Sequence, residues 1–275
     1  MIIFPPAKIN LGLYVTNKRP DGYHDIETVF YPIGLTDILE VVPDQPGLSG
    51  ETAIRFSGLP VAGEPSANLV IKAYEKIHSQ RALPPVKIWL HKAIPSGAGL
   101  GGGSSDGSAM LLTLNRLFDL RLDDALLREM ALELGSDCPF FLDPRASLAR
   151  GRGEQLRPVG LDLGGLFLYL FHPGVMISTS EAYRQVRINR PAEPLDCLIS
   201  KPVASWRGSI TNSFEPYAIN RHPVIGKILE FLRNQGALFS SLTGSGSAVF
   251  GLFDRKIGIP GHISEYLIWN EQLPS

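Results

Sequence analysis

The stretch from Ile94 to Ala109, IPSGAGLGGGSSDGSA, holds six glycines in sixteen residues. Glycine loses more backbone freedom on folding than any other residue, so an ordered stretch this rich in glycine serves a purpose that side chains would obstruct. A strongly helical segment, DGSAMLLTLNRLFDL, overlaps its end, which argues against a flexible Gly/Ser linker. Consecutive backbone N–H groups in such a turn, followed by the positive end of a helix dipole, favour binding of an anion.

Two common glycine motifs fit this stretch poorly. Gly97–Gly102 matches GxGxxG formally, but Pro95 separates it from the preceding strand, and no second strand ends in an acidic residue about twenty positions later. Gly97–Ser104 resembles a Walker A loop, but Gly103 stands where the lysine belongs. The HRD and DFG triplets of protein kinases are absent. We therefore interpret the stretch as a triphosphate cradle of another kind. A second glycine turn, Thr243–Ser247, could close over the same region, although a tight hairpin explains it equally well.

The composition excludes several other classes of protein. The chain has 275 residues, 44% of them hydrophobic and 19% charged, and its formal net charge is −1, so nothing points to disorder or to nucleic-acid binding. No apolar run reaches the roughly 18 residues of a membrane helix, and the N-terminus has no leader, so we expect a cytoplasmic protein. Cys138 and Cys197 are too few for a disulfide framework, and Cys138 is interpreted as a packed residue rather than a nucleophile. No Cys/His spacing fits zinc, so any metal is expected to have oxygen ligands.

The order of the predicted elements favours an α+β fold, because runs of strands are followed by helices without strict alternation. A shift in composition near residues 150–165 predicts two domains, 1–155 and 156–275. The helix after the glycine stretch is expected to have Ser104, Ser105 or Asp106 as its N-cap, and Asn68 is expected to cap an earlier helix. The strands are predicted at 8–16, 28–43, 84–92, 165–174 and, as a pair around a glycine turn, 237–254, and the helices at 66–80, 106–120, 123–135 and 222–236.

Three segments, in this order, resemble the motifs of the GHMP kinase family: PAKINLGLYVTNKRPDGYHDIETVF, PSGAGLGGGSSDGSA and LTGSGSAVF. The DGYH, ELGSDCPFF and HPGVMISTSEAY segments extend the resemblance over most of the chain. They point to the subfamily that uses ATP to phosphorylate the 2-hydroxyl of a methylerythritol linked to cytidine diphosphate, in the non-mevalonate isoprenoid route. The resemblance implies two domains, an N-terminal one like domain 2 of ribosomal protein S5 and a C-terminal ferredoxin-like one, with the active site in the cleft between them.

Two alternatives stay open. One is a GHMP kinase for another small alcohol, such as homoserine or mevalonate, against which DGYH argues. The other is a nucleotide-binding regulator without catalysis, against which Lys8 and Asp137 argue. Gly107 and Ser108 also depart from the two alanines usual in the family.

The resemblance also assigns residues to roles. Asp137 would accept the proton of the substrate hydroxyl, and Lys8 would keep Asp137 ionised and stabilise charge in the transition state. Asn10, two residues along the same strand, lies on the same face as Lys8. The cytosine would lie between Tyr23 and Tyr183, with His24 at its edge. The residues expected at ATP are Pro95, Gly97, Gly99, Leu100, Gly101, Gly102, Gly103, Ser104, Ser105 and Asn68, and those expected at the substrate are Asn10, Tyr23, His24, Thr179, Tyr183, Gly244 and Ser245.

The expected cofactors are ATP and Mg²⁺, and the sequence names no metal ligand. The expected partner is the small-molecule substrate alone, with no nucleic acid and no membrane, and the expected state is a monomer or a weak homodimer.

Overall fold

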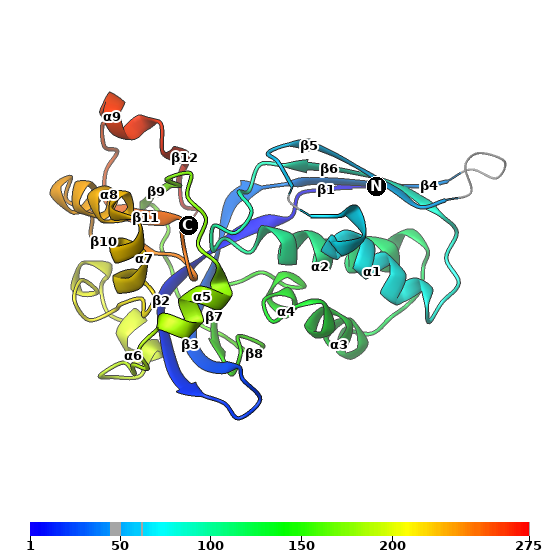
Figure 1. The fold of residues 1–275 in the computed structure, drawn as a ribbon, viewed down its shortest axis with the longest axis horizontal. Coiled ribbons are helices and arrows are strands. Elements are labelled where there is room, and N and C mark those ends of the chain that lie inside the picture. Colours follow the sequence, from blue (N-terminus) through cyan, green and yellow to red (C-terminus); the bar gives the residue numbers. More distant parts are fainter. Residues whose placement is uncertain (45–50, 62, 275) are drawn as a thin grey trace. The chain divides into compact units, whose positions relative to one another are not determined.

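The computed structural model describes residues 1–44, 51–61 and 63–274, and Figure 1 traces the course of the chain. Contacts divide the chain into two compact units. The first unit contains Met1–Ala7, Gly34–Ser96 and Gly101–Pro144, and the second unit contains Lys8–Ile33, Gly97–Leu100 and Arg145–Ser275. The units are interleaved along the chain, so this division does not test the predicted domains of 1–155 and 156–275, which stay a prediction.

The first unit is a four-stranded sheet with helices on one face. Its strands lie in the order β1-β4-β6-β5, and only β5 runs parallel to its neighbour. Burial alternates along β4 and β6, as expected for a sheet with one covered face. The inward side chains, among them Leu39, Val41 and Ile88, form one core with helices α1 and α2, which lie side by side beneath the sheet in Figure 1. The elements are β1 (Ile2–Ile3), β4 (Ile38–Pro43), β5 (Ala53–Gly58), β6 (Val86–Lys92), α1 (Leu69–His78), α2 (Gly102–Leu117), α3 (Asp124–Leu134) and α4 (Cys138–Phe141), with a 3-10 turn at Pro65–Ala67.

The second unit contains two four-stranded sheets, in the orders β2-β3-β7-β8 and β10-β11-β9-β12. The pairs β10–β11, β11–β9 and β12–β9 are antiparallel, and α8 packs its apolar face, including Ile228 and Leu232, into the core that also contains Val249 and Phe253. The strands are β2 (Pro6–Lys18), β3 (His24–Thr36), β7 (Ser147–Arg150), β8 (Gln155–Pro158), β9 (Phe167–Phe171), β10 (Phe239–Leu242), β11 (Val249–Phe253) and β12 (Leu267–Gln272). The helices are α5 (Thr179–Gln185), α6 (Leu195–Ile199), α7 (Glu215–Arg221), α8 (Pro223–Asn234) and α9 (Gly261–Ser264), with a 3-10 turn at Val203–Ser205.

Most of the predicted elements are confirmed, and two predictions are wrong. The strand predicted over 28–43 is two strands, because the chain breaks at Asp37 between β3 and β4. The N-cap of α2 is Gly101, at φ +73°, so the helix begins three to five residues earlier than the predicted caps Ser104, Ser105 and Asp106 would have placed it. The cap predicted at Asn68 is confirmed, and the helix predicted over 123–135 ends with Gly135 as its C-cap.

None of the helices within residues 1–44, 51–61 and 63–274 has the length and apolarity needed to cross a bilayer.

Candidate active site

The glycine-rich stretch forms the connection from β6 to α2. Gly97, Gly99 and Gly101 have φ angles of +69°, +80° and +73°, a left-handed conformation that side chains resist. Gly101 accepts the first hydrogen bond of the helix, from the N–H of Ser105 at 2.9 Å. The N–H groups of Gly102, Gly103 and Ser104 have no acceptor within the helix. The helix dipole favours an anion beside these N–H groups.

The two glycine turns of the sequence lie against each other in the second unit. A Cβ atom on Gly99 would collide with the carbonyl oxygen of Thr243, and a Cβ on Gly244 would lie 2.8 Å from Gly99 Cα. The N–H of Ala248 donates to the Ala98 carbonyl at 3.1 Å. Glycine at position 99 is therefore required by close backbone approach as well as by its φ angle.

Lys8 is held at this junction. Its Nζ donates to Asn10 Oδ1 at 2.7 Å and to the Gly99 carbonyl at 2.9 Å, and its backbone N–H donates to the Leu100 carbonyl at 3.0 Å. The ammonium also lies 5.0 Å from the centre of the Phe30 ring. The side chain is buried, and these contacts hold its charge in a fixed position.

Asn10 lies on the same face of β2 as Lys8, as its spacing predicts, but its amide serves mainly to hold its neighbours. Its Oδ1 accepts from Lys8 Nζ and from the Gly244 N–H at 2.9 Å, and its Nδ2 donates to Thr28 Oγ1 at 2.9 Å. The residue is 1% exposed. The expectation that it contacts substrate stays a prediction.

Asp137 lies in the first unit, at the start of the short helix α4. It occupies the N-cap position, but its side chain does not cap the helix. Lys8 belongs to the second unit, and the pairing of the two charges stays a prediction.

The other residues expected at ATP occupy two environments. Asn68 Oδ1 accepts from the Val70 N–H at 2.9 Å, which confirms its capping role, and its contact with adenine stays a prediction. Leu100 and Ser105 are buried, so their side chains face the protein interior. Gly102 is buried as well. Two of the remaining residues, Gly97 and Gly103, are exposed. The others are half-buried: Pro95, Gly99, Gly101 and Ser104.

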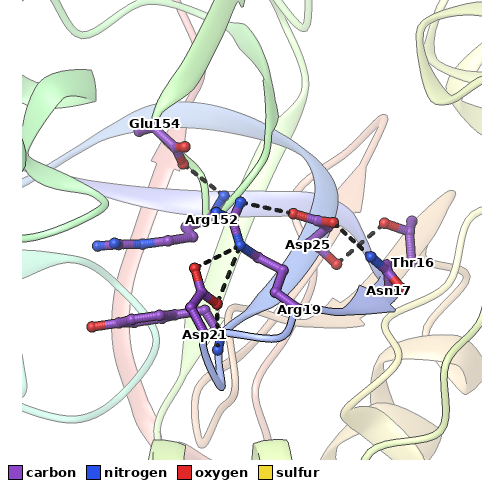
Figure 2. Close-up of polar contacts among 8 residues, drawn as sticks. Thr16, Asn17, Arg19, Asp21, Asp25, Arg152 and Glu154 are labelled. Carbon is purple, nitrogen blue, oxygen red and sulfur yellow. Dashed lines mark hydrogen bonds and ion pairs between the residues drawn. The ribbon is translucent and has the colours of Figure 1, made fainter.

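The turn between β2 and β3 is braced by ion pairs and carries Tyr23. Figure 2 shows Arg19 between Asp21 and Asp25, at 3.0 and 3.3 Å. Asp21 also accepts from the Tyr23 N–H at 3.0 Å. The Tyr23 ring is 52% exposed, and the Arg152 guanidinium lies 4.1 Å from its centre. The turn therefore presents an aromatic ring backed by a cation.

The other residues expected at the substrate meet nearby in the second unit. The rings of His24 and Tyr183 are 5.0 Å apart and tilted by 30°, and Tyr183 contacts Phe214 edge-on at 4.9 Å. Burial lowers the pKa of His24, with Lys18 adding to the effect, so the neutral imidazole is favoured and can both donate and accept. Thr179 Oγ1 and Ser245 Oγ are 3.2 Å apart. Two pairs of residues that lie far apart in sequence are thus brought together.

A buried cluster of charges was missed by sequence reasoning. Lys92, the last residue of β6, pairs with Asp37 and, at 2.7 Å, with Asp106 in the first turns of α2. Asp37 also accepts from the N–H groups of Ala93 and Ile94, at 2.6 and 2.9 Å. The cluster therefore ties together the two ends of the glycine-rich stretch. The sequence signal was a lysine and an aspartate that flank the glycines. Of these two residues, only Asp106 was considered, and it was interpreted as a possible helix cap.

Gly107 and Ser108 have structural explanations in this chain. A Cβ on Gly107 would lie 3.0 Å from Leu69 Cβ, so glycine allows α1 and α2 to approach closely. Ser108 Oγ donates to the Cys138 carbonyl at 2.7 Å and so links α2 to α4. Burial raises the pKa of the Cys138 thiol to about 11, which supports its interpretation as a packed residue.

Comparison with known proteins agrees with this fold. The family descriptions "GHMP kinases N terminal domain" and "GHMP kinases C terminal" match residues 68–143 and 198–257. Together with the relatives described next, they define the class: the chain belongs to the GHMP kinase family.

Two similar bacterial relatives carry the same name. The 4-diphosphocytidyl-2-C-methyl-D-erythritol kinase of Bacteroides fragilis (strain ATCC 25285) is 47% identical over 257 residues, 92% of each chain. The kinase of that name from Bacteroides thetaiotaomicron is 44% identical over 260 residues, 94% of each chain. A crystal structure of 4-(cytidine 5'-diphospho)-2C-methyl-D-erythritol kinase matches with a TM-score of 0.76 and 36% identity, over 92% of this chain and 90% of that one. The predicted α+β fold and two-domain GHMP architecture are thereby confirmed.

Proposed function

We propose that this chain transfers the γ-phosphoryl group of ATP to the 2-hydroxyl of 4-diphosphocytidyl-2-C-methyl-D-erythritol, in the supply of isoprenoid precursors. The observation that carries the proposal is the similarity, 47% over 92% of the chain, to a kinase named for that substrate. The fixed ammonium of Lys8 and the paired glycine turns support a phosphoryl transferase in particular.

The chemistry needs positioning, neutralisation of charge and a proton acceptor. In our proposal, Asp137 accepts the proton of the attacking hydroxyl, and Lys8 stabilises the charge that develops on the transferred group. The carbonyls of Asn10 and Gly99 hold Lys8 in one position, so little reorganisation is needed during the reaction. The N–H groups of the glycine-rich stretch would contact the phosphate oxygens of ATP.

Mg²⁺, if bound with ATP, would neutralise phosphate oxygens. No group of three or more His, Cys, Asp or Glu side chains in the described part of the chain is arranged to hold a metal ion. This fits a cation that keeps several waters and takes its other ligands mainly from phosphates. Ser104, half-buried in the first turn of α2, offers a hydroxyl for this purpose.

Substrate choice would depend on the aromatic residues of the second unit. We propose that the cytosine stacks with Tyr23 and Tyr183 and that the neutral His24 reads its polar edge. The contact between His24 and Tyr183 supports this, since it brings a hydrogen-bonding group beside a ring. Stacking of a base on an aromatic side chain contributes roughly 1–3 kcal/mol.

A coupled assay for ADP release tests the proposal. The protein is given ATP and, in separate reactions, the cytidine diphosphate-linked alcohol, homoserine or mevalonate. We expect turnover with the first alcohol and only background release with the other two. Equal turnover of homoserine or mevalonate would refute the proposed substrate, and no turnover with any of the three would refute the proposed activity. The expected cytoplasmic location and the expected monomer or weak homodimer stay predictions.

A further inference from the structure

Thr243, which no part of the sequence reasoning assigned a role, lies at the centre of the hydrogen bonds around Lys8. It directly follows β10 and is fully buried. Its Oγ1 accepts from the Asn10 backbone N–H at 3.1 Å and lies 3.2 Å both from Asn10 Oδ1 and from the Gly99 carbonyl oxygen. The hydroxyl thus contacts the same two acceptors as the Lys8 ammonium.

Counting donors and acceptors shows where the hydroxyl hydrogen goes. Asn10 Oδ1 has two lone pairs, and it already accepts from Lys8 Nζ at 2.7 Å and from the Gly244 N–H at 2.9 Å. The distance from Thr243 Oγ1 to Asn10 Oδ1 is longer than these two, at 3.2 Å. The hydroxyl hydrogen therefore goes to the Gly99 carbonyl. Gly99 O then accepts from Thr243 and from Lys8, which uses both of its lone pairs.

The surrounding backbone holds Thr243 in place. Its N–H donates to the Ala248 carbonyl at 3.0 Å, and its own carbonyl accepts from the Gly246 N–H at 3.0 Å. On the other side, Asn10 Nδ2 donates to Thr28 Oγ1 at 2.9 Å. The hydroxyl is therefore a fixed bridge from β2 to the glycine segment Gly97–Leu100.

We propose that Thr243 is a positioning residue whose hydroxyl holds the Lys8 ammonium in register with the glycine segment Gly97–Leu100. The inference rests on the proposed function, in which Lys8 stabilises the transferred phosphoryl group. Without the hydroxyl, the Asn10 N–H is buried with no acceptor in this bridge, and the Asn10–Lys8 pair loses one of the contacts that hold it. A displacement of about 1 Å at a reacting centre can reduce the rate by about 10²-fold.

The test compares Thr243→Val, which keeps the shape of the side chain, with Thr243→Ser, which keeps the hydroxyl. Thr113→Val is the matched control, because Thr113 is also a buried threonine and its Oγ1 has no partner. We expect T243V to lower kcat by roughly 10- to 100-fold while the KM of the alcohol substrate changes less than about threefold. T243S should restore kcat to within about threefold of the wild type, and T113V should leave it unchanged. Thermal melts establish that each variant is folded.

A second measurement does not depend on the identity of the alcohol. In protein labelled with ¹⁵N at lysine Nζ, a buried and hydrogen-bonded ammonium gives a slowly exchanging signal, which Lys8→Met would assign. We expect that signal in the wild type and in T243S, and its loss or broadening in T243V. If the wild type phosphorylates none of the alcohols, the proposed function fails and this signal alone decides the positioning role.

Three results would overturn the proposal. The first is a folded T243V with kcat within about threefold of the wild type. The second is a T243S variant as slow as T243V, which would assign the effect to the methyl group rather than the hydroxyl. The third is a Lys8 signal unchanged in T243V.

Discussion

Replacing Asp106 with asparagine tests whether burial or ion pairing decides the charge of this carboxyl group. Asp106 is 2% exposed; its Oδ2 lies 2.7 Å from Lys92 Nζ, and its Oδ1 has no hydrogen-bond partner. A second carboxylate, Asp37, shares the same ammonium. Burial, the largest influence, raises the pKa of Asp106 from 3.8 to about 7; Lys92 opposes the rise, and Asp37 adds to it.

The direction of the pH effect follows from this rise. A carboxyl group that binds its proton more tightly in the folded state contributes stability below its unfolded pKa of 3.8, and the contribution is lost as the pH rises through about 7. At about 1.4 kcal/mol per pKa unit, the full loss is on the order of 4 kcal/mol, and more than half of it falls between pH 5 and pH 8. Asparagine does not titrate, so D106N lacks this loss.

Urea unfolding of the wild type and of D106N at pH 5, 6, 7 and 8 measures the effect. We expect the free energy of unfolding of D106N to improve relative to the wild type by roughly 2–3 kcal/mol across this range. A difference that stays constant with pH would show that the carboxyl does not titrate there. Such a constant difference would mean that the ion pair with Lys92 outweighs burial and keeps the pKa of Asp106 below this range, and it would refute the reasoning.

Three further changes test the proposed site. Asp137→Asn should lower kcat by roughly 10²- to 10⁴-fold while calorimetry shows ATP binding retained, because a general base is removed; kcat within threefold of the wild type would exclude that role. Gly101→Val should weaken ATP binding, since Gly101 has φ +73° at the N-cap of α2 and a β-branched side chain resists that angle; unchanged affinity in calorimetry would place the phosphate contacts elsewhere. Tyr183→Ala should raise the KM of the alcohol about 5- to 150-fold and leave the KM of ATP nearly unchanged, and an equal rise in both would show that the ring packs the core or contacts adenine.

Local patterns in the sequence were enough to predict several elements that carry the candidate site, but not helix α5, which carries Thr179 and Tyr183. The period-2 spacing of Lys8 and Asn10 predicted one shared face, and the two side chains are hydrogen-bonded at 2.7 Å. The glycine-rich stretch predicted a loop leading into a helix, which is what joins β6 to α2. These features depend on neighbouring residues, so a single sequence contains them.

Contacts between distant segments explain what was missed. The predicted strand over 28–43 breaks at Asp37 because that carboxylate binds the N–H groups of Ala93 and Ile94, far along the chain. Asp106 was interpreted as a possible helix cap because its partner, Lys92, lies on the other side of the glycine-rich stretch. Local patterns do not connect the two residues. Thr243 was overlooked because its hydroxyl is satisfied by residues near the other end of the sequence. No local period or turn signal records such pairings.

The interleaving of the two units constrains how the protein is made. Among the described residues, the chain passes from one unit to the other at Ala7–Lys8, Ile33–Gly34, Ser96–Gly97, Leu100–Gly101 and Pro144–Arg145. A nascent chain that has reached Pro144 therefore carries every segment of the first unit, whereas β3 still lacks β7, its neighbour in the sheet. Synthesis from Thr36, the end of β3, to Arg150, the end of β7, takes several seconds at about 5–20 residues per second, and an edge left unpaired for that time is open to pairing with another chain. No single cleavage between described residues can release either unit whole, so neither unit can be produced alone as one contiguous piece of this chain.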